Sequence, residues 1–295
     1  MRKIKYLILV ICLSVLLSED ESKTKKKIDF KDVKLPNINI PNIIPKNLND
    51  NLARPITDHE IDKIKQASAN YIPEPVSDND IIIFETSIGT FEAKFFNDKA
   101  PNHCYNFKKL ANSGFYDGTK FHRVIQNFMV QGGDILSRDG NKGNDGTGNP
   151  GWTIDAEFNK MKHLRGTLSM ARSSDPNSAG SQFFICVSPQ AHLDGQYTAF
   201  GQVTDKVRII DHIVNSPTDS QQAIMSAESS IPDGEDANNW IGLKNPKNGK
   251  PIYFEVPKNT EKHLYTREMM AKLRSNNPFI PVIIKKVRVV KMDMN

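Results

Sequence analysis

The chain has 295 residues, of which 38% are hydrophobic and 25% charged, and its mean hydropathy is −0.49. This composition excludes a multi-span membrane protein, and three cysteines exclude a disulfide scaffold. The net charge is only +5, and arginines do not alternate with aromatic residues in the manner that stacks bases, so nucleic acid is not an expected partner. The low apolar fraction favours one compact domain with polar appendages.

Residues 1–18 are typical of an export signal. Three basic side chains, Arg2, Lys3 and Lys5, precede an apolar run at residues 6–17, which is too short to span a bilayer as a helix because that takes about 20 residues. The end of the run lacks the small residue that a cleavage site carries, so a cleaved signal and an uncleaved anchor both stay open. We expect an exported protein, periplasmic or secreted, that is either free or tethered to a membrane.

Residues 19–78 are predicted to be a Lys- and Pro-rich tether. An early lysine run precedes residues 35–45, which repeat a Pro-Asn-Ile unit, and prolines at this density favour an extended polyproline II chain. One short helix is expected in the tether, because Thr57 and Glu60 form a capping box, and it should end near Asn70.

A folded domain is predicted over residues 79–291. It begins with a hairpin between residues 80 and 95, followed by a helix that opens at Pro101 and ends at Gly114. A second helix is expected at residues 206–214. Short apolar runs separated by Gly, Asn and Pro recur at residues 121–125, 128–130, 166–170, 182–187 and 199–203. Many short strands with few helices predict a mainly β fold, a closed β-barrel.

The β pattern lapses after the second helix and returns at residues 281–290. A lone terminal strand is not stable in water, so this run must pair with the barrel, and residues 217–280 are an insertion before the final strand. Within the insertion we expect a strand at residues 253–256 and a helix at residues 261–274. The insertion is either a decorated loop packed on the barrel, which we favour because loops absorb insertions at little cost, or a docking surface.

Several other features carry no expected chemistry. The G-x-G-x-x-G pattern at residues 146–151 contains a proline and lacks a following helix, so we interpret it as a turn-rich loop and not as a nucleotide site. The seven histidines lack metal-ligand spacing, so no metal is expected. Cys104 and Cys186 have apolar neighbours and are predicted to be buried, unpaired thiols.

Three segments concentrate functional residue types. Residues 121–134 read Phe-His-Arg-Val-Ile-Gln-Asn-Phe-Met-Val-Gln-Gly-Gly-Asp, which places a cation, large apolar side chains and an amide close together. Residues 168–185 contain Leu-Ser-Met-Ala-Arg and Ser-Gln-Phe-Phe-Ile, and residues 192–201 read His-Leu-Asp-Gly-Gln-Tyr-Thr-Ala-Phe-Gly. Taken singly, Arg123 and Phe128 would be interpreted as an ion-pair partner and a core residue.

In this order and spacing, the three segments resemble the cyclophilin family of peptidyl-prolyl cis–trans isomerases. The resemblance covers roughly residues 80–214 and the last strand near residues 281–291, and its signatures F-H-R-x-x-x-x-F-M-x-Q-G-G-D and S-Q-F-F-I are highly specific. The Ala-Arg pair after Ser-Met is more similar to bacterial than to animal cytosolic members. The resemblance implies an eight-stranded antiparallel barrel, closed and capped by two α-helices.

The resemblance also implies the roles of the site residues. Arg123 and Gln131 would be catalytic: the guanidinium donates to the prolyl nitrogen as its lone pair localises, and the amide positions the substrate carbonyl. The remaining residues would bind substrate: a proline pocket of Phe128, Met129, Phe184 and Leu193, an edge at Ala171 and Arg172 that pairs with the substrate backbone, and groove positions His122, Gln182, His192 and Tyr197. No bond to the enzyme forms, so no cofactor is needed.

Two positions depart from the pattern of the cyclosporin-sensitive family members. His192 stands where those members have Trp, and Tyr197 stands where they have His. Loss of the indole surface and its N–H implies weak or no cyclosporin binding. Isomerase activity is expected to survive, because Arg123 and the proline pocket are unchanged.

We therefore expect an exported prolyl isomerase that assists the folding of other exported proteins. Its partners would be proline-containing peptides and unfolded or partly folded proteins, and it would meet a membrane only through an uncleaved N-terminal segment. The alternative is a non-catalytic scaffold of the same fold that binds proline peptides.

Overall fold

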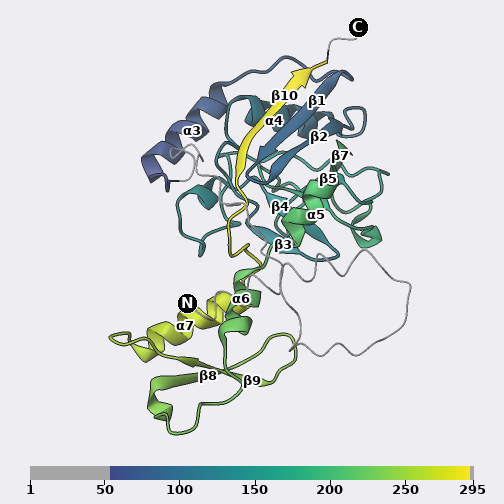
Figure 1. Ribbon diagram of the computed structural model, residues 1–295. Coiled ribbons are helices and arrows are strands. Elements are labelled where there is room, and N and C mark those ends of the chain that lie inside the picture. The colour runs from purple at the N-terminus through teal and green to yellow at the C-terminus, as the bar shows by residue number, and fades with distance from the viewer. Residues whose placement is uncertain (1–53, 293–295) are drawn as a thin grey trace, which may run out of the picture. The chain divides into compact units, whose positions relative to one another are not determined.

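The computed structural model describes residues 54–292, so the predicted export signal and the first part of the tether lie outside the described residues. The described part is dominated by one antiparallel sheet in the strand order β10-β1-β2-β7-β5-β6-β4-β3 (Figure 1). Its eight strands are β1 (Asp80–Thr86), β2 (Gly89–Phe95), β3 (Arg123–Ile125), β4 (Met129–Gly132), β5 (Thr167–Met170), β6 (Phe183–Cys186), β7 (Ala199–Asp205) and β10 (Ile284–Lys291). The predicted hairpin, the predicted last strand and its return to the sheet are confirmed.

The prediction of a closed barrel is wrong. The sheet is strongly curled, but its two end strands, β3 and β10, do not pair with each other. Residues 282–284, at the start of β10, instead bond to the residues before β3: the Phe121 amide donates to the Val282 carbonyl at 3.0 Å, and the Ile284 amide to the Thr119 carbonyl at 2.7 Å. The sequence pattern predicts individual strands but not whether the two end strands pair with each other. Closure of a barrel depends on the register between residues far apart in the chain.

Two helices pack on the sheet at the predicted places. Helix α4 (Pro101–Asn112) contacts β7 and β10, and α5 (Arg208–Val214) contacts β2, β3 and β4. The buried face of α4 carries Phe107, which lies at the centre of the core, with its ring centroid 5.1 Å from that of Tyr116 and 5.5 Å from that of Phe183. Aromatic rings at such separations add to the stabilisation that comes from burial of their area.

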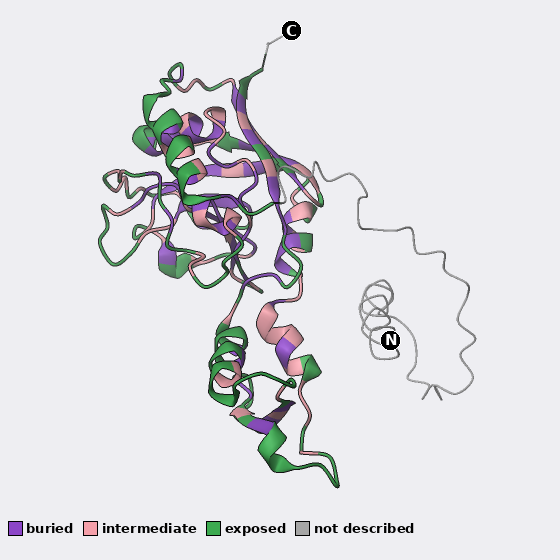
Figure 2. Ribbon diagram, turned by 90° about the vertical axis from the view of Figure 1, so that its left-hand side faces the viewer, coloured by how far each residue is buried: buried purple, intermediate pink, exposed green. Residues whose placement is uncertain are grey.

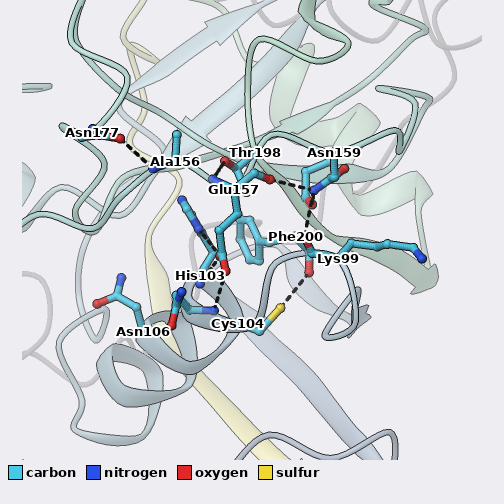
Figure 3. Close-up of polar contacts among 12 residues, drawn as sticks. Lys99, His103, Cys104, Asn106, Ala156, Glu157, Asn159, Asn177, Thr198 and Phe200 are labelled. Carbon is cyan, nitrogen blue, oxygen red and sulfur yellow. Dashed lines mark hydrogen bonds and ion pairs between the residues drawn. The ribbon is translucent and has the colours of Figure 1, made fainter.

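The N-terminus of α4 is capped from a distant loop. Ala100, the residue before the helix, offers no side chain that could cap it. The carboxylate of Glu157 takes this role, accepting from the backbone amides of Asn102 at 3.0 Å and His103 at 2.9 Å and contacting His103 Nδ1 at 2.6 Å (Figure 3). A carboxylate satisfies free amides at a helix start and favours the positive end of the helix dipole. It therefore fixes residues 156–159 on the domain.

The packed region begins earlier than residue 79. Helix α3 (Asp58–Asn70) has the predicted Thr57–Glu60 capping box and ends at the predicted residue. It is not a free part of the tether, however, because Ile56 and Ile61 are buried in the main core, and the Lys109 ammonium donates to the Ala69 carbonyl at 2.8 Å. The capping signal locates the helix, but only tertiary contacts decide whether it packs.

The insertion at residues 217–280 has a core of its own. It contains α6 (Asp219–Ser226), a hairpin of β8 (Trp240–Lys244) and β9 (Pro251–Glu255), and α7 (Lys262–Arg274). Figure 2 shows buried residues within these elements, and the core consists of Ala223, Ile241, Ile252, Phe254, Met269 and Leu273. The expected strand at residues 253–256 and the helix at residues 261–274 are present, whereas α6 and β8 were not predicted.

Two further observations bear on the predictions. Among residues 54–292, no helix is long and apolar enough to cross a membrane. Cys104 and Cys186 are both buried, unpaired thiols, and burial raises the pKa of each.

Candidate functional site

Strand register brings the two predicted catalytic residues together. Arg123 on β3 lies opposite Gln131 on β4, and Gln131 lies opposite Phe184 on β6. Directly opposed residues of antiparallel strands present their side chains on the same face of the sheet. Arg123, Gln131 and Phe184 thus form a row across three strands, although the first and last are 61 positions apart in the chain.

A relay of side-chain amides holds the Arg123 guanidinium. Gln131 Oε1 accepts from Arg123 Nη1 at 3.1 Å, and Gln131 Nε2 donates to Gln182 Oε1 at 3.0 Å. Gln182 Nε2 in turn donates to the carbonyls of Gly146 at 2.9 Å and Gly148 at 2.8 Å. Each amide uses its oxygen toward Arg123 and its nitrogen away from it, so the relay has one direction.

The guanidinium keeps donors for a ligand. Within residues 54–292, the bond to Gln131 is the one side-chain hydrogen bond that Arg123 makes. The residue as a whole is exposed, but partial burial lowers the pKa of Arg123, while Tyr197 opposes the change. Because the ordinary pKa of arginine is far above neutrality, the group stays charged.

Arg123 lines a cavity of about 150 Å³ that has an apolar wall. Its lining consists of Arg123, Phe128, Met129, Gln131, Ala171, Arg172, Phe184, Leu193 and Tyr197. Met129, Phe184 and Leu193 pack with Cys186 in a small buried cluster that is separate from the main core. Burial raises the pKa of the Cys186 thiol to about 12, so this sulfur is a neutral part of the buried cluster at pH 7.

Arg172 and Tyr197 form one rim of the cavity. The Arg172 guanidinium lies 4.5 Å from the Tyr197 ring centroid, and the Tyr197 ring meets Phe184 edge-on at 5.9 Å. Arg172 also donates to the carbonyls of Gln196 at 3.0 Å and Ser173 at 2.8 Å. Both Nη groups of Arg172 thus donate to the protein, whereas Arg123 makes one side-chain hydrogen bond. The stacked Arg172 cation also holds Tyr197 in place.

Nine of the twelve predicted site residues line this cavity. His192 lies next to it, with its ring centroid 5.8 Å from that of Phe128. Gln182 lines a second cavity and reaches the first through Gln131. His122 lines neither cavity: it is buried, and burial lowers its pKa against the opposing charge of Asp134. Neighbouring residues of extended chain point to opposite sides, so His122 turns away where Arg123 turns in.

A second cavity, which was not predicted from the sequence, lies next to the first. It measures about 270 Å³, adjoins the first at Gln131 and Ala171, and is bounded on one side by residues 146–149. These residues belong to the Gly-rich run that we interpreted as a turn-rich loop. At Gly148 a β-carbon would lie 1.9 Å from Asp134 Oδ1, so only glycine lets the loop pass this buried carboxylate. The glycines were the sequence feature that could have indicated this cavity, but nothing in their spacing predicted that they lie beside Gln182.

Comparison with known proteins identifies the family of the chain. The family described as "Cyclophilin type peptidyl-prolyl cis-trans isomerase/CLD" matches residues 81–231, half of the chain. The chain belongs to the cyclophilin family. The matched region contains all twelve predicted site residues.

Curated cyclophilin relatives are similar over the same region. A peptidyl-prolyl cis-trans isomerase of Synechococcus elongatus is 52% identical over 123 residues, which are 42% of this chain and 79% of the relative. The peptidyl-prolyl cis-trans isomerase-like 1 protein of Aspergillus niger is 42% identical over 48% of this chain and 85% of its own length. Among solved structures, a cyclophilin-type isomerase of Cryptosporidium parvum, crystallised in the presence of the dipeptide Ala-Pro, aligns with a TM-score of 0.49 and 26% identity over 72% of this chain and 99% of that chain.

Proposed function

We propose that the groove at Arg123 carries out the activity of the cyclophilin family, the isomerisation of Xaa-Pro peptide bonds, with Arg123 as the catalytic residue. Amide resonance sets a barrier of about 18–20 kcal/mol to this rotation. As the bond twists, the prolyl nitrogen regains its lone pair and becomes a better acceptor. A donor that binds the twisted state more strongly than the planar one lowers the barrier without forming any covalent bond. The free donors of Arg123 supply such a group.

The cavity supports this role because its apolar wall can hold the proline ring. Phe128, Met129, Phe184 and Leu193 offer only carbon and sulfur surface, and Met129, Phe184 and Leu193 are buried. A proline ring that fills the cavity is fixed, while the chain on the other side of the peptide bond rotates. Gln131 lines the cavity together with Arg123, and its amide can orient the carbonyl that precedes the proline.

We further propose that the substrates are unfolded or partly folded exported proteins. The basic start and the apolar run of residues 6–17 support export, to the periplasm or outside the cell, with the protein either released or tethered by this segment. Exposed Xaa-Pro bonds are abundant in chains that have not yet folded, and their uncatalysed isomerisation takes tens to hundreds of seconds. An isomerase in the same compartment would shorten this step.

The single observation that carries the catalytic proposal is the bond from the Arg123 guanidinium to Gln131, in a cavity that both residues line together with Phe128, Met129, Phe184 and Leu193. The experiment is a protease-coupled isomerisation assay on a series of Xaa-Pro peptides, comparing the wild type with Arg123→Ala. We expect kcat/KM to fall at least about ten-fold, on the scale of a lost electrostatic donor.

Arg208→Ala is the matched control, because Arg208 is an exposed arginine at the start of α5. This variant should keep the wild-type rate. If the folded wild type and Arg123→Ala both give the uncatalysed rate, the groove is a binding site for proline peptides and not an enzyme active site.

A further inference from the structure

The two ends of the insertion meet in a compact root, which we define as residues 217–220 and 275–279. The Asp219 amide donates to the Asn277 carbonyl at 2.9 Å, and the Phe279 amide donates to the Pro217 carbonyl at 2.8 Å. The Ser275 hydroxyl adds a bond to the Asp219 carboxylate at 3.2 Å. The root is thus held together by bonds between residues nearly 60 positions apart.

On one side the root contacts the strand that carries Arg123. The amide of Val124 donates to the carbonyl of Asn276 at 2.9 Å. Strand β3 is an end strand of the sheet, so the outward amide of Val124 has no strand partner. The root supplies the missing acceptor and fixes the backbone one residue from Arg123.

On its other side the root contacts the loop that bounds the second cavity. The side-chain amide of Asn277 donates to the Asp145 carboxylate, and Asn277 is only 5% exposed. Lys142 Nζ bonds to the Asp219 carboxylate at 2.8 Å and to the Pro278 carbonyl at 3.1 Å. Burial raises the pKa of Asp145, whereas the bond from Asn277 and the charge of Lys120 oppose that change. A half-buried carboxylate depends on such partners, so the loop has few alternative positions.

The contacted loop leads directly to the catalytic relay. Asp145 precedes Gly146, whose amide donates to the buried Asp134 carboxylate and whose carbonyl accepts from Gln182 at 2.9 Å. Gln182 then orients Gln131, and Gln131 orients Arg123. The root therefore reaches Arg123 by two routes, one through the β3 backbone and one through the loop and the amide relay.

We propose that the root of the insertion is a positioning element for Arg123, with Asn277 as its key positioning residue. This inference rests on the proposed function of the groove. The insertion is then required for full turnover even though none of its residues lines either cavity at the site. A displacement of the loop would loosen the guanidinium, while the proline cavity, built on β4, β6 and the turn η2 (Ala191–Leu193), would be unaffected.

The test is a cycle of variants at Asn277 and Asp145. Asn277→Asp places two carboxylates, those of residues 277 and 145, opposite each other, where they repel. The variant should lower kcat about ten-fold with little change in KM, because displacement of a reacting group reduces turnover more than binding. Asp145→Asn places one side-chain amide opposite another, which still allows one hydrogen bond. Its kcat should therefore fall less than that of Asn277→Asp. The double variant Asn277→Asp/Asp145→Asn restores a carboxylate–amide pair and should recover most of the lost kcat.

Asn248→Asp is the matched control, because it makes the same change at an exposed turn of the same insertion. The wild type must isomerise the peptide first; if it does not, the proposed function fails before this inference is tested. If the wild type is active, a folded Asn277→Asp variant with wild-type kcat, or a double variant with no recovery, overturns the inference.

A surface variant covers the case in which Asn277→Asp does not fold. Lys142→Met removes the ion pair to Asp219 from a side chain that is 36% exposed, so folding should be retained. Its kcat should fall about two- to three-fold, a loss on the scale of one partly exposed ion pair. Lys272→Met, which removes an ion pair inside α7 at 2.6 Å from Glu268, is its control and should keep wild-type kcat. Equal kcat values for the two lysine variants would overturn the inference in that case.

Discussion

One charged side chain carries the proposed chemistry, and uncharged side chains determine where it points. Gln131 and Gln182 use both their donors and their acceptors within the relay, so neither amide can flip without losing a bond. Replacing either residue would leave Arg123 charged but less well oriented. Arg172 differs, because both of its Nη groups donate to backbone carbonyls, so Arg123 keeps more donors for a substrate.

At position 192 a single side chain is predicted to control cyclosporin affinity. His192 is exposed beside Phe128 and does not contact Arg123 or Gln131, so it can be replaced without disturbing the relay. His192→Trp adds a large flat surface and an indole N–H at the edge of the cavity, and we expect cyclosporin to bind at least about ten-fold more tightly, as an aromatic anchor contributes on that scale. Titration calorimetry of the two proteins measures the difference.

The isomerisation rate serves as the internal control for the His192→Trp experiment. Because the catalytic group and the proline cavity are unchanged, kcat/KM on a short Xaa-Pro peptide should stay near the wild-type value. Equal cyclosporin affinities for the wild type and the His192→Trp variant would show that residue 192 does not control cyclosporin binding.

Among the elements, α3 is predicted to contribute to the stability of the domain. Ile61 on its inner face is 3% exposed and belongs to the main core, whereas Ile72, just after the helix, is 81% exposed. Ile61→Ala should lower the free energy of unfolding by about 2 kcal/mol or more, because it removes buried surface and leaves a cavity. Ile72→Ala should change it by less than about 0.5 kcal/mol. Urea denaturation of both variants tests the pair, and equal midpoints would mean that α3 does not pack in solution.

Local signals in the sequence predicted elements well, and long-range contacts account for what was missed. The Thr57–Glu60 box located α3, and the proline and glycine that flank α4 located that helix, because caps act within one turn. The residues of the proline cavity followed from the family resemblance. The open sheet, the cap from Glu157 on α4 and the role of Gly146 and Gly148 could not be predicted, because each depends on partners tens of residues away.

At the scale of the whole molecule, three buried histidines link stability to pH. His103, His122 and His163 come from different segments, and burial lowers the pKa of all three, although Glu157, Asp134 and Asp194 each oppose the shift of one. The unfolded chain takes up these protons near pH 6.5, at the ordinary histidine pKa, whereas the folded chain takes them up only at lower pH. The unfolded state therefore binds more protons between these values, and stability falls as the pH drops through this window.

We expect the free energy of unfolding to be lower at pH 5.5 than at pH 7.5, with a steeper fall than the carboxylates alone would give. The Asp194 carboxylate affects stability only at lower pH, because the backbone amide of His163 and the Lys162 ammonium hold its pKa at about 2. Urea denaturation across this range, repeated with His163→Gln, should show a shallower slope for the variant, since one proton-binding site of the unfolded chain is gone. His59→Gln, at an exposed position on α3, should leave the slope unchanged. A His163→Gln slope equal to that of the wild type would mean that the buried ring is protonated as readily in the folded chain as in the unfolded one.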